Sequence, residues 1–238
     1  MNIFGAMSVV LLTALAACAE NSSNKLQYQS YFPLGTWGEA GANWTPEEYA
    51  RFHEHWFGRQ LFAMQEPSLA TMSATTALVH YRVTVLPSFT PPQMVHIRKE
   101  PVGSATVTYK STLGSGGFEP GDLWEHTSQT LSENRLVHLE KTIAKLGLWE
   151  RRALEMKPVI CFDGTTYVLE VARNGYFNAV NIHECEVLPE FRSVLELFDQ
   201  LVPRPLLDEM TYMRKMAKEC QPPLEPDICA KILEEYAE

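Results

Sequence analysis

The stretch that decides the fold is PVICFDGTTYVLEVARNGYFNAVNIHEC, residues 158–185. Two Asx-Gly pairs, Asp163-Gly164 and Asn174-Gly175, separate three runs of β-favouring residues. The backbones of these pairs tolerate the positive φ angles of tight hairpin turns, and apolar and aromatic residues flank each pair. The stretch therefore predicts a three-stranded antiparallel meander.

The register of this meander follows if both turns have two-residue loops, because Phe162 then pairs with Thr165 and Arg173 with Tyr176. One face becomes a contiguous apolar surface made of Ile160, Tyr167, Leu169, Val171, Val180 and Ile182. Such a surface must be buried, and the amphipathic helix that Pro189 begins is the expected cover.

The opposite face of the meander is mixed. It carries a candidate polar ligand-binding ledge formed by Thr166, Glu170, Asn181 and His183. Arg82 or Arg98 would join this ledge if the earlier strands belong to the same sheet. A solvated sheet face without a ligand is the alternative interpretation.

Residues 77–112 alternate between apolar and polar side chains, which predicts three more antiparallel strands. Helices are predicted from Thr45 to Met64, over 133–146, from Pro189, and over 206–219 and 227–236, with Thr45 and Glu48 as a capping box. The order of elements predicts an α+β fold, an antiparallel sheet of about six strands with amphipathic helices packed on one face.

The N-terminus predicts export. An uncharged apolar run, residues 3–19, precedes the polar Glu20-Asn24 and is short for a membrane span. It ends in Leu15-Ala16-Ala17-Cys18, which resembles the lipobox of bacterial lipoproteins, although residues 1–8 lack the usual Lys or Arg. The resemblance implies a signal peptide over 1–17 and acylation of Cys18 with fatty acid such as palmitate. A plain signal peptide with an incidental Cys18 and an uncleaved anchor are the alternative interpretations.

The resemblance also implies a lipid bilayer as the partner of the acylated Cys18, because several acyl chains hold a soluble domain at a membrane. Ala19 follows the cysteine where aspartate favours inner-membrane retention, so the expected location is the outer membrane, facing the periplasm. Residues 18–44 would form a lipidated tether, and 45–238 a single domain with a helical C-terminal extension over 203–238.

Composition and cysteine spacing limit the function classes. The formal net charge of −9 and the absence of a long Lys/Arg run argue against nucleic-acid binding. Cys220 and Cys229 bracket a turn-rich segment and are the first choice for a disulfide. In the predicted meander, Cys161 and Cys185 lie two strands apart, which is too far for a disulfide.

No motif for a catalytic nucleophile, a metal site or a cofactor is present. His53-Glu54-His55 does not predict a zinc site, because helical residues two apart point in divergent directions. The glycine-rich residues 113–121 lack the helix and lysine of a phosphate loop. DGTTYVLEVARNGYF resembles a hairpin segment of uncharacterised bacterial exported proteins, which implies export but no activity.

The sequence thus favours a non-catalytic envelope lipoprotein that binds a ligand, an envelope protein or another surface component. An exported hydrolase with an unrecognised active site is the alternative.

Overall fold

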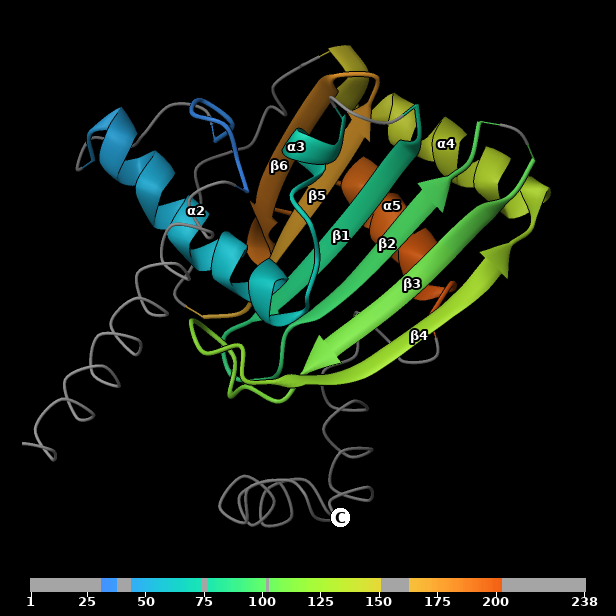
Figure 1. Cartoon of the computed structure of the whole chain (residues 1–238). Coiled ribbons are helices and arrows are strands. Elements are labelled where there is room, and N and C mark those ends of the chain that lie inside the picture. Colours follow the sequence, from blue (N-terminus) through green and yellow to red (C-terminus); the bar gives the residue numbers. More distant parts are fainter. Residues whose placement is uncertain (1–30, 38–43, 74–76, 102, 151–162, 203–238) are drawn as a thin grey trace, which may run out of the picture.

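The computed structural model describes residues 31–37, 44–73, 77–101, 103–150 and 163–202. Its centre is one six-stranded antiparallel sheet with the strand order β4-β3-β2-β1-β5-β6 (Figure 1). The strands are β1 (Val79–Pro87), β2 (Gln93–Lys99), β3 (Ala105–Thr112), β4 (Leu123–Leu131), β5 (Thr165–Arg173) and β6 (Tyr176–His183).

Helices cover both faces of this sheet. Helices α4 (Glu133–Lys145) and α5 (Pro189–Asp199) pack on one face, whereas α2 (Pro46–Ala63) and the short α3 (Leu69–Ser73) lie on the other (Figure 1). Short 3₁₀ turns follow α4 and β6, at Leu148–Glu150 and Glu184–Glu186. The predicted α+β class is confirmed. The expectation that helices pack on one face holds for α4 and α5 and is wrong for α2.

The first core lies between the sheet and the helices α4 and α5. Tyr167, Leu169, Val171 and Ile182 from β5 and β6 all belong to it. The helix that Pro189 begins covers them, as predicted, with side chains that recur every three or four residues: Phe191, Val194, Leu195 and Phe198.

The second core lies on the opposite face, beneath α2. Phe57 and Leu61 of α2 pack there with the N-terminal residues Tyr31, Phe32 and Trp37. The Phe32 and Trp37 ring centroids are 4.7 Å apart, and those of Trp37 and Phe57 are 4.9 Å apart. The aromatic residues before α2 are therefore part of the folded domain.

The pairing of β5 corrects the predicted meander. Its turn at Asn174-Gly175 is confirmed, with φ angles of 50° and 80° and with Arg173 opposite Tyr176. The other edge of β5, however, pairs with β1 along its whole length, so that Val85 lies opposite Tyr167. The predicted pairing of residues 158–162 with β5 is therefore wrong, and the argument against a Cys161–Cys185 disulfide loses its basis.

Local signals placed the start of α2 correctly. Thr45 Oγ1 accepts a hydrogen bond from the Glu48 backbone N at 3.2 Å, and Glu48 Oε2 accepts one from the Thr45 backbone N at 3.0 Å. This is the predicted capping box.

The predicted lipobox, the helices over 206–219 and 227–236 and the Cys220–Cys229 pair lie outside the described residues. Within the described ranges, no helix combines the length and apolar content needed to cross a membrane.

Candidate functional site

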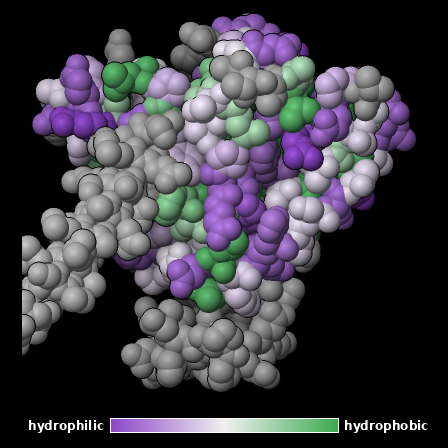
Figure 2. All heavy atoms as spheres, viewed as in Figure 1, coloured by the Kyte–Doolittle hydropathy of each residue, from purple (hydrophilic) through white to green (hydrophobic). Residues whose placement is uncertain are grey.

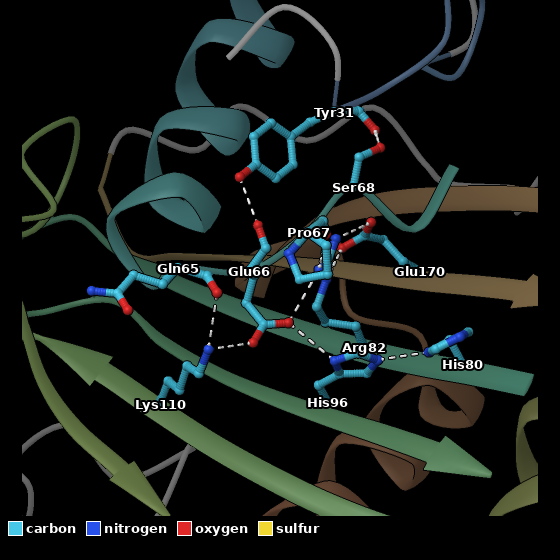
Figure 3. Close-up of polar contacts among 10 residues, drawn as sticks. All are labelled: Tyr31, Gln65, Glu66, Pro67, Ser68, His80, Arg82, His96, Lys110 and Glu170. Carbon is cyan, nitrogen blue, oxygen red and sulfur yellow. Dashed lines mark hydrogen bonds and ion pairs between the residues drawn. The ribbon is translucent and has the colours of Figure 1, made fainter. Parts of the chain in front are cut away.

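A group of ionisable side chains lies buried between the sheet and the turn that follows α2. We call it the charge network (Figure 3). Each member is at most 8% exposed, and the members come from the turn and from four strands: Glu66, His80, Arg82, His96, Lys110 and Glu170.

Strand alternation explains why charged groups gather here. In β1, Tyr81 and Val83 point into the first core, so the intervening His80 and Arg82 point to the opposite face. The register then places Arg82 between His96 on β2 and Glu170 on β5. Figure 2 shows hydrophilic residues gathered over the middle of this face.

Arg82 and Glu170 form the centre of the network. Arg82 Nε donates to Glu170 Oε2 at 2.6 Å and Nη2 donates to Oε1 at 2.7 Å. The remaining terminal nitrogen of Arg82, Nη1, donates to the Pro67 carbonyl at 2.8 Å. Neither side chain reaches solvent, so each charge must be paired within the protein. An unpaired charge at either position would greatly lower the free energy of unfolding.

Glu66 is the acceptor that joins the turn to the strands. Lys110 Nζ lies 2.7 Å from Oε1, while His96 Nδ1 and Arg82 Nη1 lie 3.0 and 3.4 Å from Oε2. Burial alone raises the pKa of this carboxyl, but the His96 hydrogen bond and the charges of its partners outweigh burial and lower the pKa to about 2. Glu66 is therefore ionised under all physiological conditions.

His80 and His96 extend the network by one step. Nδ1 of His80 lies 2.9 Å from Nε2 of His96, whose other nitrogen faces Glu66. Burial, with His96, Arg82 and Arg98 nearby, lowers the pKa of His80 to about 4. Nε2 of His80 is buried and has no hydrogen-bond partner among the described residues.

The network fixes the turn over residues 65–68 against the sheet. Lys110 Nζ donates to the Gln65 carbonyl at 3.1 Å, and Gln65 adopts a positive φ of 54°. Tyr31 donates its hydroxyl hydrogen to the Glu66 carbonyl at 2.7 Å, and Ser68 Oγ donates to the Tyr31 carbonyl at 2.8 Å. The same interactions therefore hold the N-terminal aromatic segment in place.

An open cleft of about 1000 Å³ lies beside this turn, and we call it the Glu66 cleft. It separates the end of α2 from the chain over 119–123, and an ion pair of 3.0 Å between Arg59 and Glu119 crosses between these two walls. Polar and apolar residues line it: Tyr31, Arg59, Phe62, Ala63, Gln65, Glu66, Pro67, Glu119, Pro120, Gly121, Asp122 and Leu123.

The glycine-rich loop between β3 and β4 supplies one wall of the cleft. Trp56 Nε1 and Gln60 Nε2 of α2 both donate to the Gly117 carbonyl, at 2.9 and 3.2 Å. Gly116 has a φ of 88°, and a Cβ there would lie 2.5 Å from the Thr90 backbone N. Glycine is thus required at position 116 for close backbone packing.

The predicted ledge residues lie on one face of the sheet, as expected, but Glu170 is buried apart from the others. Glu170 is fully buried in the charge network, where it contacts Arg82 as expected for a continuous sheet. Thr166 and His183 are cross-strand partners at the start of β5, and Asn181 lies opposite Val168, so these residues share the sheet face of Glu170 but do not join its network. Arg98 pairs instead with Glu100 at 3.3 Å, at an exposed position.

His183 has a local structural role. Its Nδ1 caps the turn at Glu184–Glu186 by accepting from the Cys185 backbone N, and lies 3.0 Å from Cys185 Sγ. Cys185 is disulfide-bonded, so its sulfur is not a free thiol beside His183. Cys18, Cys161, Cys220 and Cys229 lie outside the described residues.

Sequence reasoning missed Glu66, His80, His96 and Lys110 as site residues. The only signal of the strand residues was charge at alternate positions, which is also typical of a solvated strand face, and Glu66, in the turn after α2, gave no signal. Among the described residues, no group of three or more His, Cys, Asp or Glu side chains has an arrangement that could hold a metal ion.

Comparisons with protein-family models and with curated proteins gave no match.

Proposed function

We propose that this chain is an exported lipoprotein, anchored to the outer membrane through acylated Cys18, whose domain binds a ligand without catalysis. The anchor rests on the lipobox-like Leu15-Ala16-Ala17-Cys18 after an uncharged apolar run. The observation that carries the binding role is the Glu66 cleft, whose size is in the range of small-molecule sites.

The anchor is tested by mass spectrometry of the protein purified from bacterial membranes. We expect a mature N-terminus at Cys18 that carries acyl chains, and we expect Cys18→Ser to leave the protein unacylated and released from membranes. An unmodified Cys18 in the wild-type protein would refute the anchor and leave the binding role untouched.

The pairing of the ionisable groups with one another favours a binding role over hydrolysis. Both carboxylates of the charge network are paired with cations, and both nitrogens of His96 face partners. Among the described residues, no hydroxyl or thiol hydrogen-bonds to His80 or His96, although nucleophilic catalysis needs such a contact. We therefore assign the charge network a structural role, in which it holds one wall of the Glu66 cleft in place.

The binding role is tested by native mass spectrometry of protein released from membranes in mild detergent. Ala63→Trp should fill the cleft from the end of α2, whereas Ala144→Trp adds the same side chain at an exposed position of α4. We expect a bound small molecule on the wild type and on Ala144→Trp, and none on Ala63→Trp. A bare wild-type protein, or equal loading of both variants, would contradict the cleft as the site.

A further inference from the structure

A second, separate pocket lies beside the middle of α2. Its volume is about 490 Å³, and it shares no lining residue with the Glu66 cleft. The N-terminal segment, α2 and α3 each contribute lining residues to it: Phe32, Pro33, Leu34, Arg51, Glu54, Ala70 and Thr71. We call it the Glu54 pocket.

Glu54 is unusual because the residue is mostly buried while its carboxylate has no partner among the described residues. Only 6% of the residue is exposed, and its carboxylate has no hydrogen bond or ion pair among the described residues. It belongs to the buried side of α2, with Ala50, Phe57 and Leu61, where an apolar residue would be expected. A glutamate in such a place costs stability, which makes a role in binding the natural explanation.

The chemistry of the pocket selects the kind of ligand. A buried carboxylate is stabilised most strongly by a group that carries both positive charge and N–H donors. Phe32, Pro33 and Leu34 offer apolar surface next to it, and Thr71 adds a hydroxyl. Arg51 is the one other charged side chain that lines the pocket; it is exposed, and its Nε donates to the Glu47 carbonyl at 3.3 Å.

We propose that the Glu54 pocket binds a small primary amine, with the ammonium group on the Glu54 carboxylate and an aliphatic body against Phe32, Pro33 and Leu34. The middle residue of the His53-Glu54-His55 triplet is then the ligand-binding one, without any metal. Burial raises the pKa of Glu54 to about 7, so amine binding should strengthen as the pH rises through neutrality. Among the described residues that line the pocket, Arg51 is the other titratable group.

The test is a titration of the full chain with n-butylammonium chloride, followed by NMR chemical shifts at pH 8. Uncharged n-butanol and sodium butyrate serve as probes of the same length. Glu54→Gln keeps the shape of the side chain and removes its charge, and Glu47→Gln makes the same change at an exposed position of the same helix.

We expect saturable binding of n-butylammonium that Glu54→Gln weakens by about tenfold or more, while Glu47→Gln stays within about twofold of the wild type. Circular dichroism and the melting temperature of Glu54→Gln establish that the variant is folded. The proposal is overturned if no saturable binding occurs up to about 50 mM amine, if n-butanol or butyrate binds as tightly as the amine, or if Glu54→Gln binds like the wild type.

Discussion

Arg82 and Glu170 stand 88 residues apart in the sequence and meet in the centre of the sheet through two parallel hydrogen bonds of 2.6 and 2.7 Å. Neither side chain is exposed to solvent. This pair links β1 to β5. Among the described strands, the pairing of β1 with β5 is what joins the four N-terminal strands to the C-terminal hairpin of β5 and β6.

Removing one member of this pair should be strongly destabilising. Glu170→Gln leaves Arg82 buried with an incomplete set of acceptors, so we expect a loss of about 3–5 kcal/mol in the free energy of unfolding. Urea denaturation measures this loss. Arg98→Met, which removes an exposed cation from β2, should change the stability by less than about 0.5 kcal/mol.

The double variant Arg82→Met with Glu170→Leu separates loss of the pair from loss of packing. Because no unpaired charge remains, we expect it to be more stable than Glu170→Gln. If the double variant were less stable than Glu170→Gln, buried charge would not be the cause.

Acidification should weaken the domain through His80. The pKa of His80 is about 4 in the fold against an ordinary value of 6.5, so the unfolded chain binds the proton first and stability falls from pH 6.5 toward pH 4. We expect His80→Gln to lose less stability than the wild type between pH 7 and pH 5, by on the order of 1 kcal/mol. Equal losses in urea titrations at the two pH values would refute this role.

Glu54 should act in the opposite direction. Its pKa is raised to about 7, so the fold keeps a proton that the unfolded chain releases near pH 4.5, and stability falls as the pH rises between these values. Without ligand, Glu54→Gln should therefore be more stable than the wild type at pH 8, by on the order of 1 kcal/mol. Thermal melts at pH 8 and pH 4 should show the advantage only at the higher pH.

Two glycines with similar backbone angles allow a matched test of loop packing. Gly103 and Gly116 have φ angles of 91° and 88°, but a Cβ at Gly103 meets nothing within 4 Å, whereas at Gly116 it would meet Thr90. We expect Gly103→Ala to cost about 1 kcal/mol and Gly116→Ala about 3 kcal/mol or more. Similar costs in urea denaturation would mean that the loop shifts easily away from Thr90.

Local signals in the sequence predicted much of the sheet and its helices. The alternation in residues 79–110, the Asn174-Gly175 turn and the spacing of Phe191, Val194 and Phe198 each report an interaction between near neighbours. Strand β4 was missed because the run Glu125 to Thr130 is polar on both faces, as an edge strand with few buried side chains allows.

The candidate sites depended on contacts that no local pattern contains. Glu66 follows a helix end and gave no signal of its own, and its role requires the turn to lie over β1, β2 and β3. The apolar stripe of α2 indicated burial but not which face of the sheet it would cover. The prediction that Arg82 could meet Glu170 was correct only on the condition that both strand groups form one sheet.

The position of β5 has a consequence for how the chain folds while it is being synthesised. Strand β1 is complete at Pro87, but its partner β5 ends 86 residues later, at Arg173. Until then β1 presents an open edge to which another chain could add a strand. Arg82, in the middle of that edge, makes such an addition unfavourable, because a foreign strand would bury its charge without supplying Glu170. The same arginine would thus protect the newborn chain from aggregation before it completes the native sheet.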